Sequence, residues 1–218
     1  MTSGRYFWIL PPEVSMPKAN LVRITAEFTI KNGRARARDL EEFARGRFPR
    51  PAVYDLHSYA EATPHRLVSI HEWDCLFFPQ VMGQIRELHD DLRRAGFEVL
   101  RERIWYPVLQ SLAFLRQSST EKLYCFLRGQ VVAPETILDE VVEVCRRNGI
   151  SLDWDVNLDP RSKSRFGAWH ISREFSRSGN IFNAQAEFSV ILTELGQCGA
   201  RVHQHLQLYY VVKDTENG

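Results

Sequence analysis

Two histidines near the C-terminus have the spacing of metal ligands on a β-strand. His203 and His205 are separated by one residue, and alternate residues of a strand project from the same face. His170 lies in another predicted strand and offers a third imidazole, a ligand that zinc and other transition metals accept. These three histidines are candidate ligands of a divalent metal ion, and His203 and His205 are alternatively general acid–base groups if the protein is an enzyme. A polar strand face without a metal explains the same pair.

Charged and polar side chains also alternate along a strand predicted over residues 21–31. We expect polar residues of the strand predicted over 66–73, including His71, to lie beside them. A cleft between two halves of the chain would bring such faces together, with the guanidinium of Arg23 or Arg173 holding an anion. The sequence therefore predicts a cleft that binds a small anionic ligand. Its candidate ligand-binding residues are Arg23, Glu27, Lys31, His71, His170 and Arg173.

Part of the first strand resembles the glutamate-rich strand motif of the CYTH family. The segment Glu27-x-Thr29-x-Lys31 carries the similarity, with threonine where the family motif has a second glutamate. Members of that family bind triphosphates and divalent metal inside a tunnel, so the resemblance implies those ligands for this strand face. A polar strand face with cross-strand charge pairs is the alternative interpretation.

Two basic segments give an alternative hypothesis, a protein that binds RNA or another nucleic acid. The formal net charge is only +1, so such binding requires a local patch of basic side chains. Solvated charged loops explain both segments equally, and a protein–protein adaptor without catalysis is a further alternative. The sequence contains no GxSxG, P-loop or GxGxxG motif. The candidate nucleic-acid residues are Arg34, Arg36 and Arg38 within residues 31–50, and Arg161, Lys163 and Arg165 within residues 161–165.

Hydrophobic periodicity predicts the elements that position these residues. The C-terminal half has the order β-α-β-β-α-β, the ferredoxin-like plan, in which helices cover one face of an antiparallel sheet. The N-terminal half fits the same plan, but prolines interrupt residues 49–64, which we interpret as an edge strand or a loop. The other predicted strands are 21–31, 66–73, 97–106, 123–132, 152–158, 168–175 and 202–212, and the predicted helices are 37–44, 79–95, 134–148 and 188–195.

The fold class expected from this order is α+β, with two ferredoxin-like units in tandem. We place the divergent N-terminal half at residues 1–115 and the C-terminal half at 121–218, and interpret them as an internal duplication. A hydrophobic content of 44% is sufficient for a continuous core. No apolar run is long enough to span a bilayer, and no CxxC pair is present. Four scattered cysteines favour reduced thiols in a cytoplasmic protein: Cys75, Cys125, Cys145 and Cys198.

Overall fold

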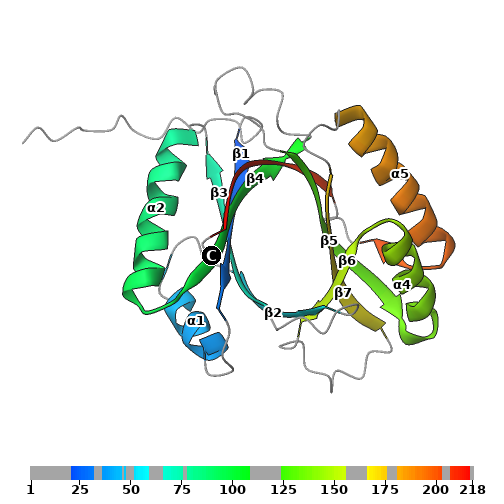
Figure 1. Ribbon diagram of the computed structural model, residues 1–218, viewed down its shortest axis with the longest axis horizontal. Helices are drawn as coiled ribbons and strands as arrows, with labels where there is room; N and C mark the ends of the chain where they lie inside the picture. Colours follow the sequence, from blue (N-terminus) through cyan, green and yellow to red (C-terminus); the bar gives the residue numbers. More distant parts are fainter. Residues whose placement is uncertain are drawn as a thin grey trace, which may run out of the picture.

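One antiparallel sheet curls round until its ends meet and forms the centre of the molecule (Figure 1). The strand order is β7-β6-β2-β3-β1-β4-β9-β5-β8, and β7 pairs with β5 as well, which closes eight of the strands into a ring. The computed structural model describes residues 21–31, 36–45, 47, 52–58, 66–75, 78–108, 124–155, 166–175, 181–202 and 207–216.

Both halves of the chain contribute four strands to the closed sheet. The N-terminal half supplies β1 (Val22–Ile30), α1 (Arg36–Arg45), β2 (Ala52–Ser58), β3 (Arg66–Cys75), α2 (Phe78–Arg94) and β4 (Val99–Pro107). The C-terminal half supplies β5 (Tyr124–Pro134), a 3-10 turn (Glu135–Ile137), α4 (Leu138–Arg147), β6 (Ser151–Asp155), β7 (Phe166–Glu174), α5 (Ile181–Gln197), β8 (Arg201–Val202) and β9 (Gln207–Glu216). The halves join through the antiparallel pairs β4–β9 and β2–β6.

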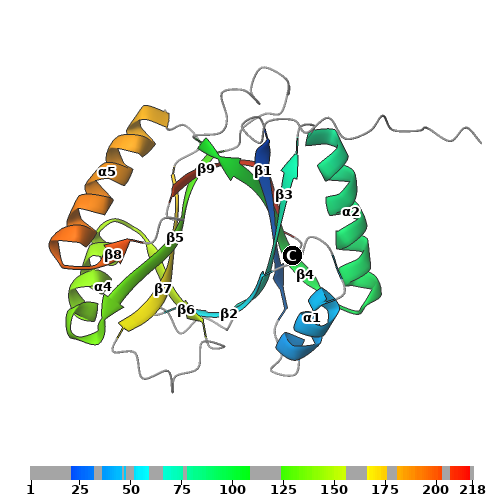
Figure 2. The same cartoon turned by 180° about the vertical axis from the view of Figure 1, so that it is seen from behind.

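The helices lie outside the closed sheet, α1 and α2 against one half and α4 and α5 against the other (Figures 1 and 2). Alternation on β1 explains the arrangement, because every second side chain from Val22 to Ile30 is buried on the helix side. Residues of α2 at helical spacing, from Val81 to Leu92, meet them. Burial of each such side chain contributes roughly 1.5–3 kcal/mol.

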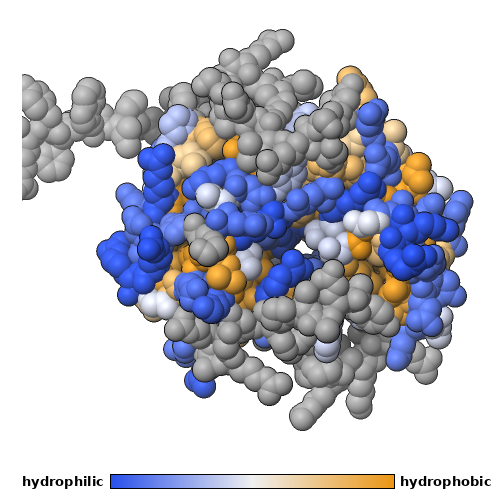
Figure 3. Space-filling view, viewed as in Figure 1, coloured by the Kyte–Doolittle hydropathy of each residue, from blue (hydrophilic) through white to orange (hydrophobic). Residues whose placement is uncertain are grey.

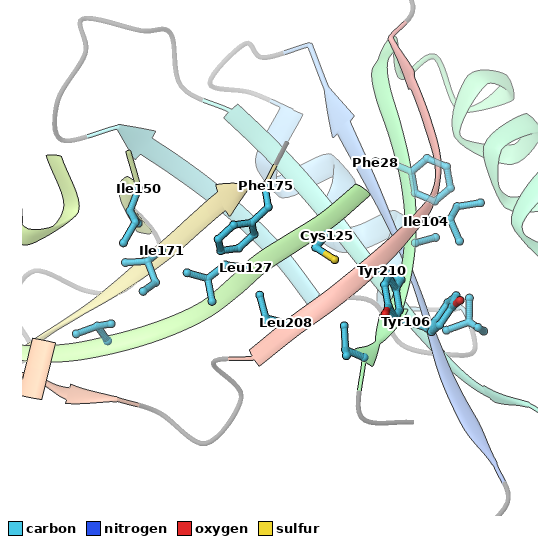
Figure 4. Close-up of a cluster of buried hydrophobic side chains, with 14 of the residues drawn as sticks. Phe28, Ile104, Tyr106, Cys125, Leu127, Ile150, Ile171, Phe175, Leu208 and Tyr210 are labelled. Atoms are coloured by element: carbon cyan, nitrogen blue, oxygen red, sulfur yellow. The ribbon is translucent and has the colours of Figure 1, made fainter. Parts of the chain in front are cut away.

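This outer core continues across the junction between the halves. Figure 4 shows Phe28 and Ile104 on one side of it and Leu127 on the other. At the junction the rings of Tyr106 on β4 and Tyr210 on β9 lie 5.8 Å apart. The apolar residues of both halves therefore form one continuous core that packs across the junction between them.

One detail of the predicted elements is wrong, and another falls partly outside the described residues. Segment 49–64 contains a regular strand, β2, which is not at an edge because it pairs with both β3 and β6. Its prolines, Pro49, Pro51 and Pro64, all stand outside Ala52–Ser58, so every backbone N–H within the strand is available for pairing. The predicted strand 202–212 is described in two parts, β8 up to Val202 and β9 from Gln207, and residues 203–206 lie outside the described residues.

The end of α5 gives a direct test of backbone conformation. Gly199 has a φ of +87°, and the N–H of Ala200 bonds to the carbonyl of Leu195 at 3.0 Å, as in a glycine-ended helix. Gly199→Ala is expected to lower the free energy of unfolding by about 1 kcal/mol. The matched control is Gly196→Ala within the helix, where an added Cβ meets nothing within 4 Å and should stabilise by roughly 0.5–1 kcal/mol. Urea denaturation checks both signs; destabilisation by both variants would contradict this account.

Within the described residues, no helix is both long and apolar enough to cross a membrane. All four cysteines are free thiols, and Cys75, Cys125 and Cys145 are buried.

Candidate ligand-binding site

The inward face of the closed sheet is unusually polar for the interior of a small protein. On β1, Arg23 and Thr25 line one cavity and Glu27 and Thr29 line another, while the residues between them face the helices. Hydrophilic side chains also gather around the opening of the sheet where the surface is described (Figure 3). Because buried polar groups are costly unless they are paired, this face requires an internal set of partners or a ligand.

A cavity of about 340 Å³, which we call the chamber, occupies one end of the interior. Side chains from both halves line it, so that neither half forms it alone. Its volume lies at the lower end of the range of small-molecule sites. The polar and aromatic side chains that line it include Arg23, Tyr54, Trp105, Arg128, Gln130, His170, Gln207 and Tyr209.

Arg128 on β5 places a positive charge at the inner end of the chamber. It forms an ion pair with Glu27 on β1, although β9 and β4 lie between these strands in the sheet, so the pair spans the interior. The guanidinium also lies over the Trp105 ring, 5.3 Å from its centroid. Burial lowers the pKa of Arg128 to about 10, which still leaves it protonated at neutral pH.

His170 on β7 is neutral beside this charge. Burial, and then the charge of Arg128, lower its pKa to about 4. Its Nε2 lies 3.3 Å from Nε2 of Gln130, and its ring meets that of Tyr54 edge to face at 4.8 Å. At neutral pH His170 is therefore a neutral hydrogen-bonding group, and Arg128 is the cation of the inner chamber.

The opposite end of the interior is filled by ion pairs. Arg101 donates two hydrogen bonds to Asp214, at 2.7 and 2.6 Å, and a third to Glu174 at 2.9 Å. Arg103 pairs with Glu174, and the Tyr124 hydroxyl donates to Asp214. Burial opposes ionisation of Asp214, but Arg101 and Tyr124 outweigh it and lower its pKa. A cavity of only about 40 Å³ lies near this end, so of these two cavities among the described inward-facing residues the chamber is the one with room for a small molecule.

Three of the sequence-predicted ligand-binding residues meet in this interior. Arg23 and His170 line the chamber, and Glu27 pairs with Arg128 at its inner end. Arg23 is already paired with Asp74 at 3.1 Å and Glu72 at 3.6 Å. Both carboxylates raise the pKa of its guanidinium, and the hydrogen bond that Arg23 donates to Asp74 does so most strongly.

The other three predicted residues lie elsewhere. The expectation that His71 lies beside Glu27 is wrong, because His71 pairs with Ala26 and faces the helices. It lines a separate outer cavity of about 300 Å³ with Arg47 and Asp91. Lys31 is exposed and pairs with Glu98 at 3.0 Å. Arg173 faces α5, where it pairs with Glu187.

The metal and nucleic-acid hypotheses fall largely on residues that the structure leaves undescribed. His203, His205, Arg34, Arg161, Lys163 and Arg165 all lie outside the described residues, as does the side chain of Arg36. Arg38 is exposed and pairs with Glu42 at 3.4 Å. Within the described part of the chain, no group of three or more His, Cys, Asp or Glu side chains could hold a metal ion. Both hypotheses stay predictions.

Several residues of the chamber were not identified from the sequence. Arg128 and Gln130 alternate with the buried Leu127 and Val131 on β5, and that alternation was a usable signal for an inward polar face. Tyr54 belongs to the segment interpreted as an edge strand or loop. Trp105 and Tyr209 read as ordinary core aromatics, because nothing in the local sequence distinguishes the inside of a closed sheet from its helix-covered outside.

Comparisons with known proteins add little to this geometry. No protein-family model matches the sequence, and no curated protein matches it significantly. A candidate glycine cleavage system transcriptional repressor is similar in structure, with 13% identity over 90% of this chain and 98% of that chain and a TM-score of 0.25. A candidate chlorite dismutase shares 13% identity over 88% of this chain and 95% of its own, with a TM-score of 0.29. An unknown protein from Galdieria sulphuraria shares 11% identity over 88% and 99% of the two chains, with a TM-score of 0.27. At these TM-scores the similarities carry no argument about function.

Proposed function

We propose that the protein binds a small anionic organic molecule in the chamber, and that Arg128 is the group that holds its negative charge. The observation that carries the proposal is a largely buried guanidinium, its side chain 15% exposed, at the inner end of a cavity large enough for a ligand. The protein would act as a ligand-binding protein, or as an enzyme if residues near the chamber add chemistry to binding.

We further propose that the two halves are ferredoxin-like units in tandem, with the chamber between them. In support, the strand orders β4-β1-β3-β2 and β9-β5-β7-β6 are the same when each half is numbered from its own first strand. In both halves the helices follow the first and third strands of this series. A duplicated unit of this kind would account for a site lined by residues of both halves.

The electrostatics of Arg128 favour an anion over a neutral ligand. Its pKa is lowered because nearby negative groups compensate only in part for the solvation that the guanidinium loses on burial. Its ion-pair partner, Glu27, does not line the chamber and lies beyond its inner end. Arg128 itself lines the chamber, so the guanidinium also borders that cavity. A carboxylate or phosphate placed there gains charge-assisted hydrogen bonds and restores part of the lost solvation.

Titration with 2-naphthoate and with its uncharged amide, 2-naphthamide, tests the proposal by calorimetry. We expect the carboxylate to bind at least about tenfold more tightly than the amide, since hydrogen bonds to charged groups contribute about 1.5–3 kcal/mol. Glu27→Gln should strengthen naphthoate binding by removing a competing carboxylate. Glu27→Gln/Arg128→Met should abolish the preference for the carboxylate. Equal affinity for carboxylate and amide, or no binding of either, would overturn the proposal.

A further inference from the structure

We infer that the anionic ligand of the chamber carries a flat aromatic ring, an inference that rests on the proposed function and narrows its ligand class. Two tyrosines and a tryptophan line the chamber: Tyr54 on β2, Tyr209 on β9 and Trp105 on β4. They come from both halves of the chain. Such residues can pack against one another as core side chains, or they can form the walls of a slot that binds a ring.

The strand order places two of these rings on opposite walls. Around the closed sheet, three strands separate β2 from β9 in either direction, so Tyr54 and Tyr209 approach the chamber from opposite sides. Figures 1 and 2 show β2 and β9 facing each other across the interior. Packing alone would bring such rings into contact with each other, whereas here a cavity of about 340 Å³ lies between the walls.

Each aromatic wall is held in place by its own neighbours. The Tyr54 ring is fixed edge to face against His170 at 4.8 Å. The Tyr209 ring lies 6.1 Å from that of Trp105, and its hydroxyl accepts a hydrogen bond from Gln207 at 3.1 Å. Preorganised walls lose little side-chain freedom on binding, which favours a rigid flat ligand.

The polar groups are placed to orient such a ring by one charged end. Arg128 and Gln130 lie at the β5 side of the chamber, together with the neutral His170. Aromatic faces prefer offset-stacked or edge-to-face ring contacts, which contribute beyond the area that they bury. A saturated ring of the same size and charge would keep the ion pair with Arg128 and lose these contacts.

The test compares 2-naphthoate with decahydro-2-naphthoate, which carries the same charge on a saturated skeleton. We expect the aromatic acid to bind about three- to tenfold more tightly, the range that one favourable ring contact provides. Tyr54→Leu and Tyr209→Leu should each reduce this preference, and the double variant should remove most of it, while the preference for carboxylate over amide is unchanged. A matched control is Phe182→Leu, an exposed aromatic on the outside of α5.

The outcomes separate this inference from the proposed function. Equal binding of the two acids, with both bound more tightly than 2-naphthamide, would overturn the aromatic ring and leave anion binding in place. Tighter binding of the saturated acid would also overturn it. Equal binding of acid and amide would overturn the proposed function, and the inference with it.

Discussion

Replacing Arg128 alone by methionine is expected to destabilise the protein by about 3–5 kcal/mol, because it leaves the carboxylate of Glu27 buried without its partner. Glu27 is 7% exposed, and its carboxylate pairs with this guanidinium. The pair also bridges β5 and β1 across the interior, so its loss removes a link between the two halves. Chemical denaturation at pH 7 measures the change in the free energy of unfolding.

The double variant Glu27→Gln/Arg128→Met is the matched control for this prediction. It removes both charges, and replacing a buried ion pair by neutral groups of similar volume is often close to neutral. We expect it to recover most of the stability lost in Arg128→Met, which a double-mutant cycle reports as a coupling energy. If the double variant is as unstable as Arg128→Met, the cost comes from lost packing around Trp105 and not from the unpaired carboxylate.

Acidification from pH 7 to pH 5 is expected to cost about 4 kcal/mol through two buried histidines. Burial lowers the pKa of His71 to about 4, helped by the charge of Arg47, and lowers that of His170 to about 4 in the same way beside Arg128. In the unfolded chain both titrate near pH 6.5. The unfolded state therefore binds protons first, so the stability is fully present above pH 6.5 and is lost progressively as the pH falls toward 4.

Variants at the two histidines divide this effect between the outer and inner faces of the sheet. Each histidine should contribute a slope of about 1 kcal/mol per pH unit between pH 6 and pH 4.5, because the folded and unfolded states differ by somewhat less than one bound proton over this range. His71→Gln and His170→Gln should each remove about half of the slope, and the double variant should remove most of it. Denaturation curves at several pH values give the slopes; an unchanged slope in His170→Gln would show that this imidazole is accessible to protons in the folded state.

Ligand binding should couple to the protonation of His170 and not to that of His71. His170 lines the chamber, whereas His71 lies on the outer face behind β3. An anion beside Arg128 offsets the positive charge that helps to keep His170 neutral. Naphthoate should therefore change the pH dependence contributed by His170 and leave that of His71 as it is.

Local sequence patterns were enough to predict most of the secondary structure. Hydrophobic alternation over Val22–Ile30 and helical spacing over Phe78–Arg94 depend on neighbouring residues and one buried face. Both signals survive in any tertiary arrangement that covers that face. The prediction for residues 49–64 was wrong because all the prolines of this segment flank β2 and none lies within it.

The candidate site could be predicted only in part. Alternation correctly placed Arg23 and Glu27 on the face opposite the core of β1, and it placed His170 opposite Ile171 on β7. It could not assign His71, because the face of β3 that meets this side of β1 depends on the register between the two strands. In that register His71 is level with Ala26 and so turns toward the helices.

The sequence by itself determined the order of strands and helices, the apolar face of each, and the identity of the charged residues on the other face. Only the tertiary structure decided that the sheet closes, and closure is what converts an open polar face into a chamber with a buried cation. Arg128 and Glu27 are separated by a hundred residues in the chain and by two strands in the sheet. Their pairing depends on the curvature of the whole sheet, which no local pattern encodes.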